Sequence, residues 1–274
     1  MSASLQNFTG TLVLVGAGKM GGAMLEGWLA LGLDPAKVAI LEPRPADEIA
    51  ALKERGVRIN PAPASITDAA VIILAVKPQV AAEVVPPLRA LARPNTVAVS
   101  VMAGKTLAFL GGALGDIAIV RSIPNTPAAI GRGITVAVPN AKVTAAQRTL
   151  AHTLLSGVGA VEWVDDEALI DAATAVSGSG PAYVFLLAES LAHAGAAAGL
   201  PADLAARLAR ATVAGSGELL HRSPLEAATL RQNVTSPNGT TAAALAILMA
   251  ADGLDPMMEK AVAAATKRSR ELAG

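Results

Sequence analysis

The sequence predicts an α/β protein of two domains, a parallel sheet covered by helices over residues 1–165 and an all-α domain over residues 166–274. In the first part, short apolar runs rich in β-branched residues alternate with helix-length segments. That rhythm is typical of a parallel sheet buried on both faces. After Asp166 such runs stop, and only helix-length segments remain between breaks that contain Pro and Gly. The length of the chain also favours two domains over one core.

The elements follow in order along the chain. The expected strands are Thr11–Val15, Val38–Leu41, Val71–Val76, Thr96–Met102, Ile117–Arg121, Ile134–Val138 and Val161–Val164. The expected helices of the first domain are Met20–Leu31, Ala46–Arg55, Gln79–Leu91, Leu107–Leu114 and Ala145–Leu155. Those of the second domain are Glu167–Ala175, Pro181–Ala198, Ala202–Leu220, Pro224–Asn233, Thr240–Ala251 and Pro256–Leu272. These last helices are apolar on more than one face, so we expect a homodimer packed through them, with a tight monomeric bundle as the alternative.

Composition excludes several classes of protein. Twenty-two basic residues balance twenty-two acidic ones without a block of like charge, which excludes the footprint of a nucleic-acid binder. Cysteine is absent and the three histidines are far apart, so we expect no metal site. The first residues lack the pattern of a signal peptide, and the most apolar window contains Glu189 and His193, which suits a buried helix better than a membrane span. We therefore expect a soluble, cytoplasmic protein without membrane partners.

The stretch "TLVLVGAGKMGGAML" carries a dinucleotide-binding fingerprint. Gly16, Gly18 and Gly21 have G-x-G-x-x-G spacing between an expected strand and an expected helix. The first glycine permits the tight turn, the second lets the backbone approach a pyrophosphate, and the third lets helix and strand pack closely. The spacing alone is weak, because glycine-rich turns are common. Its strand–turn–helix context makes the first domain a Rossmann-type domain that binds NAD or NADP.

The end of the second strand bears on which cofactor is bound. Glu42 lies 21 residues after Gly21, where an acidic residue grips the ribose 2′-hydroxyl of NAD. Arg44 follows and could pair with the 2′-phosphate of NADP. Solvated loop charges are the alternative for both residues. We expect NADP (NADPH), with NAD accepted as well.

Two further segments follow strands at the edge where a cofactor passes. "LAVKPQ" places Lys77 and Pro78 after a buried strand, and "VSVMAGKT" places Ala103 and Gly104 after the next. A surface lysine and an ordinary turn are the alternatives. Residues 121–133, "RSIPNTPAAIGRG", either line the nicotinamide pocket or turn the chain, and the sequence favours neither.

The helical half limits the chemistry that the reducing cofactor can serve. Reduction of a ketone creates an alkoxide that needs a proton donor such as Lys, His or Tyr. No lysine lies between Lys142 and Lys260, and Tyr183, the only tyrosine, follows Pro181 at an expected helix start. Reduction of a protonated imine yields a neutral amine, so hydroxyls and amides suffice there. The sequence therefore favours an imine substrate.

"TSPNGTT", residues 235–241, offers such groups: four hydroxyls just before an Ala-rich helix. The free amides and the dipole at a helix start favour an anion. We expect Ser236 and Thr240, with the amides of Gly239 and Thr240, to bind a substrate carboxylate, and Thr241 to reach a ring nitrogen. Ordinary helix N-caps are the alternative, although one hydroxyl would be enough for a cap.

With these motifs the chain resembles the pyrroline-5-carboxylate reductase family nearly end to end. The resemblance rests on "GAGKMGGAM", "AVKPQ", "NTPAAIGRG", "SGSGPAYVF" and "NVTSPNGTT", of which the last three are specific in combination. It implies reduction of 1-pyrroline-5-carboxylate to L-proline, the last step of proline biosynthesis, with NADPH or NADH. It also implies a helical domain that interlocks two subunits, and dimers that assemble into decamers.

The resemblance assigns roles to particular residues. It implies that the substrate sits at the dimer interface beside the loop of residues 235–241, with Thr241 as the catalytic residue and Ser236, Gly239 and Thr240 around the carboxylate. It implies that Asn233 touches the cofactor. The remaining cofactor-lining residues that it implies are Gly16, Ala17, Gly18, Lys19, Met20, Ala75, Val76, Lys77, Pro78, Ala103 and Gly104.

Three features depart from the family pattern. Asn238 stands where the usual loop has the first of two glycines, and Pro63 stands where an asparagine often faces the adenosine phosphate. Glu42 and Arg44 pull cofactor preference in opposite directions, so NADPH against NADH stays open, as do dimer against decamer and feedback by proline.

A β-hydroxyacid dehydrogenase is the enzymatic alternative, but it needs a lysine in the helical half. A dinucleotide sensor without turnover is the non-enzymatic one.

Overall fold

A computed structural model describes residues 4–273, which form two compact units. One unit, here called the sheet unit, runs to Gly178 and takes up the chain again at Thr266. The other, the helical unit, comprises Ser179–Ala265. The expected boundary at residues 165/166 falls before this division, because Ile170 packs into the core of the sheet unit beside Ile123. The domain boundary itself stays a prediction.

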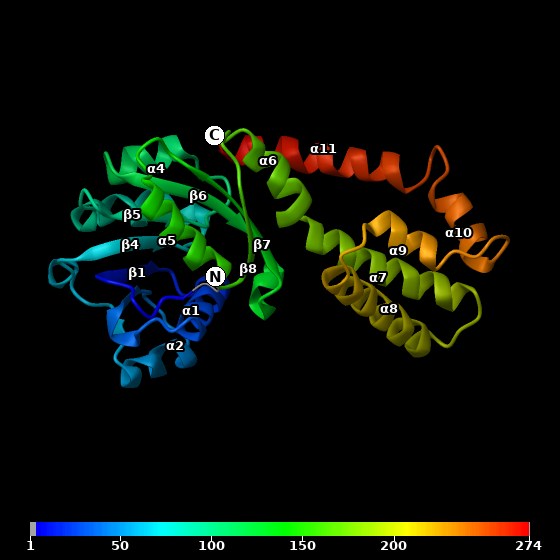
Figure 1. Ribbon diagram of the computed structural model, residues 1–274, viewed down its shortest axis with the longest axis horizontal. Helices are drawn as coiled ribbons and strands as arrows, with labels where there is room; N and C mark the ends of the chain where they lie inside the picture. Colours follow the sequence, from blue (N-terminus) through cyan, green and yellow to red (C-terminus); the bar gives the residue numbers. More distant parts are fainter. Residues whose placement is uncertain (1–3, 274) are drawn as a thin grey trace. The chain divides into compact units, whose positions relative to one another are not determined.

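The sheet unit is built on one eight-stranded sheet in the order β3-β2-β1-β4-β5-β6-β7-β8 (Figure 1). The strands are β1 Thr11–Val15, β2 Val38–Leu41, β3 Arg58–Ile59, β4 Ala69–Leu74, β5 Val97–Ser100, β6 Ala118–Pro124, β7 Gly133–Pro139 and β8 Gly159–Trp163. All seven expected strands are present, and the two-residue β3 adds an edge strand beside β2. The prediction of an α/β fold with a Rossmann-type sheet is confirmed.

One strand pairing differs from the parallel sheet expected from the sequence. β6 and β7 pair antiparallel, with Val120 opposite Pro139 and Pro124 opposite Thr135, whereas the other pairings are parallel. Only residues 125–132 connect these two strands, and they form the 3₁₀ helix η6 (Thr126–Ile130). A parallel return needs a crossover of a dozen or more residues, so this short connection can only make an antiparallel turn.

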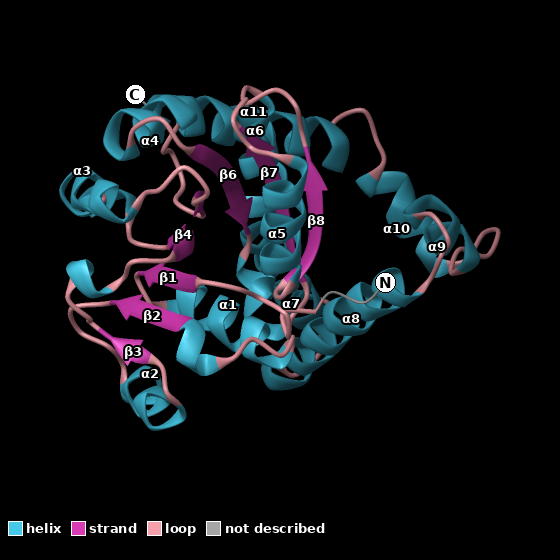
Figure 2. Ribbon diagram, turned by 60° about the vertical axis from the view of Figure 1, so that its left-hand side comes forward, coloured by secondary structure: helices cyan, strands magenta, loops and turns pink. Residues whose placement is uncertain are grey.

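Successive residues of each central strand enter opposite cores, as a strand covered on both faces requires. Leu12 and Leu14 of β1 join a core with α1 (Lys19–Ala30) and α5 (Ala145–Ser156). Val13 and Val15 join a core with α3 (Ala81–Val84) and α4 (Leu107–Leu114). Figure 2 shows α1 and α5 beside the strands. Trp28 links α1 to α5 within the first core, because its Nε1 donates a hydrogen bond to the carbonyl of Leu154 at 2.7 Å.

The remaining helices of the sheet unit are short, and four of the 3₁₀ helices among them begin at a proline. They are α2 Asp47–Ala51, α6 Leu169–Ala173, the π-helix η7 Thr174–Gly178, and the 3₁₀ helices η1 Pro35–Lys37, η2 Leu52–Arg55, η3 Pro63–Ser65, η4 Pro78–Val80 and η5 Pro86–Leu91. The helix expected over Gln79–Leu91 is interrupted, since Pro86 and Pro87 lack the N–H that a continuous helix needs. The first turn of the broken segment follows directly from Lys77.

The helical unit contains only helices, as expected. They are α7 Gly180–Ala197, α8 Ala202–Arg222, α9 Ala227–Asn233, α10 Thr240–Leu248 and the first part of α11 Leu254–Ala273. Helices α7 and α8 lie side by side (Figure 1). Among the residues of this unit only Ala205 and Ala209 are buried within the single chain, while Phe185 is 61% and Ile247 75% exposed. No helix in the described part of the chain is long and apolar enough to cross a membrane.

Candidate active site

The turn between β1 and α1 has the geometry that its glycines predict. Gly16 has a φ of +90°, and a Cβ there would lie 2.7 Å from the carbonyl oxygen of Ala75. A Cβ on Gly21 would lie 2.2 Å from the carbonyl oxygen of Gly16. No heavy atom lies within 4 Å of the position of a Cβ on Gly18. The first and third glycines are therefore needed for packing, whereas the second keeps the backbone open on its outer side.

Backbone hydrogen bonds hold this turn between two strand ends. The amide of Gly16 donates to the carbonyl of Leu41 at 2.9 Å, and the amide of Ala75 donates to that of Val15 at 2.8 Å. The turn thus lies at the carboxyl edge of the sheet, between the ends of β2 and β4. The strand order reverses between β1 and β4, which is where sheets of this type bind dinucleotides.

The other segments expected to line the cofactor lie at the same edge. Val76 and Pro78 are half-buried after β4, and Lys77 is exposed. Ala103 is exposed after β5, and Gly104 adopts a φ of +67°. A Cβ on Gly104 would lie 3.0 Å from the carbonyl oxygen of Leu272 on α11, so the last turn of α11 lies beside this turn.

The residues after β2 form a small network of their own. The Glu42 carboxylate accepts the amide of Ala17 through Oε2 and the amide of Arg44 through Oε1, both at 3.1 Å. The side chain of Asn60 accepts the amide of Glu42 and donates to its carbonyl, both at 2.9 Å. Arg44 is exposed. Sequence reasoning missed the role of Asn60, because its partner lies on another strand.

The sheet edge fits a dinucleotide. No atom lies within 4 Å of the place where a Cβ on Gly18 would be, and both Gly18 and Lys19 are exposed at the start of α1. No side chain caps that helix. The free amides of a helix start suit a pyrophosphate. Gly16, Ala17, Gly18, Lys19 and Met20 would hold it.

Segment 121–133 turns the chain between β6 and β7. Asn125 is buried there, and its Oδ1 accepts the amide of Ile134 at 3.0 Å. Its Nδ2 donates to the carbonyl of Ser177 in the π-helix at 3.1 Å. These bonds explain Asn125 as a brace between the β6–β7 turn and the segment before α7.

The hydroxyl-rich loop of residues 235–241 belongs to the helical unit. Helix α10 begins at Thr240 with Gly239 as its N-cap, and no side chain caps it. The hydroxyl of Thr235 donates to the carbonyl of Arg231 at 2.6 Å and so closes the end of α9. Within residues 4–273, the hydroxyls of Ser236, Thr240 and Thr241 have no hydrogen bond to the protein. The helix start is therefore where the sequence places it, and its hydroxyls do not serve as caps.

The backbone of the loop sets the position of its hydroxyls. Asn238 adopts a left-handed conformation with a φ of +57°. A Cβ on Gly239 would lie 2.4 Å from the hydroxyl oxygen of Ser236, so a side chain at position 239 would force that hydroxyl into another rotamer. The amide of Gly239 donates to the carbonyl of Ser236 at 3.1 Å. This amide, expected to be free for a ligand, is occupied within the turn, whereas that of Thr240 is at the first helical position, where no intrahelical acceptor exists.

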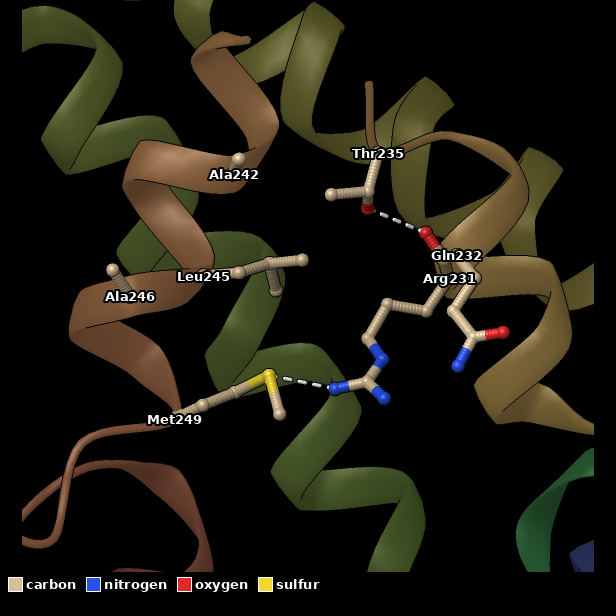
Figure 3. Close-up of a pocket in the computed structure, with 7 residues that line it drawn as sticks. All are labelled: Arg231, Gln232, Thr235, Ala242, Leu245, Ala246 and Met249. Atoms are coloured by element: carbon tan, nitrogen blue, oxygen red, sulfur yellow. Dashed lines mark hydrogen bonds between the residues drawn. The ribbon is translucent and has the colours of Figure 1, made fainter. Parts of the chain in front are cut away.

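An open groove lies next to this loop, between α9 and α10 (Figure 3). Its lining residues are Arg231, Gln232, Thr235, Ala242, Leu245, Ala246 and Met249. Arg231 bridges the two helices, since its Nη1 lies 2.6 Å from the sulfur of Met249. The groove does not include Ser236, Thr240 or Thr241, and its α10 side is apolar. Asn233, the last residue of α9, is exposed.

Comparison with known proteins decides the family. Residues 167–272 match the family model for pyrroline-5-carboxylate reductase dimerisation, and residues 11–104 match that for coenzyme F420-dependent NADP oxidoreductases. The pyrroline-5-carboxylate reductase of Pseudomonas aeruginosa is 40% identical over 267 residues, which cover 97% of each chain. The chain belongs to the pyrroline-5-carboxylate reductase family. The reductase of Pisum sativum is 36% identical over 96% of each chain.

Solved structures of pyrroline-5-carboxylate reductases have the same fold. That from Coxiella burnetii superposes with a TM-score of 0.89 at 33% identity, covering 97% of this chain and 99% of the other. That from Plasmodium falciparum, which has NADP bound, gives a TM-score of 0.78 at 27% identity, covering 98% and 99%. Membership of the reductase family confirms the resemblance seen in the sequence. The roles of individual residues stay predictions.

Proposed function

We propose that this chain reduces 1-pyrroline-5-carboxylate to L-proline, with NADPH as the reductant and NADH accepted as well. The observation that carries the proposal is the start of α10, which no side chain caps and near which three residues of the described chain have hydroxyls without hydrogen bonds to the protein. The loop of residues 235–241 contains no ionisable side chain. Such a site suits an anionic substrate whose nitrogen is already protonated.

The carboxyl edge of the sheet, with Gly16–Met20, would hold NADPH, which would supply the hydride for the carbon of the substrate C=N bond. In the loop, the hydroxyl of Ser236 and the amide of Thr240 hold the substrate carboxylate, assisted by the dipole of α10. The hydroxyl of Thr241 accepts a hydrogen bond from the ring nitrogen and orients it. Gly239 contributes mainly through its missing side chain, which leaves room for Ser236. Because the cationic nitrogen becomes neutral during the reaction, no acid is needed to quench a developing charge.

The proposed enzyme works as a homodimer paired through its helical unit. The exposed apolar side chains of α7 and α10, with Phe185 and Ile247 the most exposed on each, support this pairing. The match of residues 167–272 to a dimerisation model supports it as well. Assembly of dimers into decamers, location in the cytoplasm and the expected absence of nucleic-acid partners stay predictions.

Loss of NADPH absorbance in the presence of 1-pyrroline-5-carboxylate tests the proposal, with L-proline identified by chiral chromatography. Running the same assay with NADH gives the cofactor ratio. A 3-oxo acid serves as the contrasting substrate, since its reduction needs the proton donor that the helical half lacks. Turnover of the 3-oxo acid in place of the imine would indicate a β-hydroxyacid dehydrogenase. Tight cofactor binding without turnover of either substrate would indicate a sensor.

A further inference from the structure

The first residue of α4 is tied to β6 by a single carboxylate oxygen. The amide of Leu107 donates to Oε1 of Glu167 at 2.8 Å, and Nη1 of Arg121 donates to the same oxygen at 2.6 Å. Arg121 lies on β6 with a side chain only 4% exposed, whereas Glu167 lies just before α6 with a side chain 31% exposed. Three segments that are distant in the sequence therefore meet at Glu167.

This contact fixes where α4 begins. The first amides of a helix have no acceptor within it, and Thr106, the N-cap residue, accepts only the amide of Phe109, at 3.1 Å. The amide of Leu107 is satisfied by Glu167 instead. Arg121 stays protonated, and a buried guanidinium holds its carboxylate partner in a narrow geometry. The start of α4 is thus set from outside the helix, by a carboxylate that Arg121 holds in place.

The segment that carries Glu167 also supports the turn before α4 from its outer side. Asp171 on α6 accepts a hydrogen bond at 2.7 Å from the hydroxyl of Ser269, a buried residue of α11. Leu272, in the last turn of α11, lies beside Gly104, where an added Cβ would come within 3.0 Å of its carbonyl oxygen. Residues 167–171 therefore hold the end of the turn of residues 101–106 and also the helix that lies against it.

That turn lies in the half of the sheet that receives the nicotinamide end of a dinucleotide. The adenosine end lies at the carboxyl end of β2, and the cofactor crosses the point between β1 and β4 where the strand order reverses. Because β5 lies beyond that point, the turn after it faces the nicotinamide half. A misplacement of about 1 Å between reacting groups can lower a rate about 100-fold, so the position of this turn matters for hydride transfer.

We propose that Glu167 is a positioning residue for hydride transfer. It acts through the amide of Leu107 and, together with Arg121, places the turn of residues 101–106 against the nicotinamide half of the cofactor. In this role Glu167 contacts protein groups only. The inference rests on the proposed function, because it takes the carboxyl edge of the sheet as the site of NADPH.

The test compares two probes that occupy different parts of the site, by isothermal titration of the full-length protein. NADPH spans both halves, whereas 2′,5′-ADP carries only the adenosine half. In Glu167→Ala, the affinity for NADPH is expected to fall about 10-fold, while that for 2′,5′-ADP changes less than about 2-fold. A merely structural role would weaken both probes together, because a loosened sheet edge holds neither.

Glu167→Gln separates the two contacts of the carboxylate. Its amide oxygen can still accept the amide of Leu107, but Arg121 is left without a negative partner, so the affinity for NADPH should fall only about 3-fold. This variant also tests the inference if thermal melts show that Glu167→Ala misfolds. Glu162→Gln, the same substitution at an exposed residue of β8, is the matched control and should leave both affinities unchanged.

Steady-state kinetics give a second measurement. With NADPH saturating, kcat for 1-pyrroline-5-carboxylate should fall about 10-fold in Glu167→Ala, because a displaced nicotinamide no longer points its hydride at the substrate. The KM of this substrate should stay nearly the same, since the loop of residues 235–241 is untouched by the substitution.

Unchanged NADPH affinity in both Glu167 variants would overturn the inference, as would an equal loss for the two probes or an equal loss in Glu162→Gln. Failure of the proposed function looks different. A protein whose variants respond to the two probes as expected, but which does not reduce 1-pyrroline-5-carboxylate, contradicts the proposed function and leaves the role of Glu167 in placing the cofactor intact. A wild-type protein that does not bind NADPH contradicts both.

Discussion

The two units of this chain position their candidate binding segments in opposite ways. In the sheet unit the central strands are fully buried, and the glycine-rich turn is placed by contacts between backbone atoms. In the helical unit only Ala205 and Ala209 are buried within the single chain, and the loop of residues 235–241 is shaped by its own backbone. The sheet unit has a core of its own. The helical unit leaves its apolar surface to be covered by something else, and association and stability are then linked.

The largest expected effect comes from placing a charge on that apolar surface. Phe185 is 61% exposed on α7. If α7 is covered by a second copy, Phe185→Glu buries an unpaired charge, which costs about 3–5 kcal/mol. Sedimentation velocity should then show a smaller particle. Val80→Glu, at a residue 41% exposed in the sheet unit, is the matched control and should leave the particle size unchanged. If the two variants gave particles of the same size, the apolar surface of the helical unit would not differ from that of the sheet unit in its role in association.

The next prediction separates two roles of the glycines in the turn between β1 and α1: close packing against neighbouring backbone, and room for the cofactor to approach. Gly21→Ala puts a Cβ 2.2 Å from a backbone oxygen, so we expect a loss of about 1–3 kcal/mol in stability together with loss of NADPH binding. Gly18→Ala meets no atom within 4 Å, so its melting temperature should hardly change. Its NADPH affinity should still fall by about tenfold or more, because the pyrophosphate approaches there. Thermal melts and cofactor titrations of both variants check this, and a Gly18→Ala protein with normal affinity would contradict it.

A third prediction concerns the chemistry of the helical unit. Thr241→Ala should lower kcat by about 10-fold to about 100-fold, since it removes one hydrogen bond to the reacting nitrogen without removing an acid. Steady-state kinetics with saturating NADPH measure this. Thr149→Ala on the exposed face of α5 removes a hydroxyl bonded to the carbonyl of Ala145 and should leave kcat unchanged. Full activity in Thr241→Ala would mean that its hydroxyl does not meet the nitrogen.

Patterns that are local in the sequence predicted the fold correctly, and they predicted where the glycine-rich turn and the start of α10 lie. β1 and β2 begin and end at the expected residues, and α10 starts at Thr240 as expected. The glycine spacing predicted the turn because Gly16 and Gly21 are each required by a neighbour that is either a few residues away or at the end of the adjacent strand. Asn238 stands where the family's loop has a glycine, and its positive φ is consistent with the tolerance of asparagine for that region.

Features that depend on distant partners were missed. The bracing of Glu42 by Asn60 joins two strand ends, and β3 is too short to leave an apolar pattern. The antiparallel return at β7 was foreseeable, since residues 125–132 are too few for a crossover. That α10 starts without a side-chain cap could not be read from the sequence, because four hydroxyls at a helix start fit a cap as well as a site.

A smaller effect is expected at the substrate carboxylate. Ser236→Ala removes a contact that is equally strong in the bound substrate and in the transition state, so KM should rise by about tenfold while kcat stays nearly the same. Steady-state kinetics with 1-pyrroline-5-carboxylate separate the two constants. A fall in kcat at constant KM would move Ser236 from the carboxylate to the reacting centre. Ser236 and Thr241 would then no longer have separate roles, one in binding the carboxylate and the other at the reacting nitrogen.

The smallest effect tests whether the loop is shaped by its backbone, in contrast to the packed turn of the sheet unit. Asn238 has a φ of +57°, where glycine is unstrained and asparagine is tolerated. Asn238→Gly relieves the native backbone but adds freedom to the unfolded chain, so stability should change by less than about 0.5 kcal/mol and KM should be kept. Asn238→Ala has no such tolerance and should cost about 1 kcal/mol and raise KM, because the loop then shifts Ser236 and Thr240. If Ala and Gly behaved alike in thermal melts and in KM, the left-handed residue would not be what positions the hydroxyls, and contacts from outside the loop would have to do so.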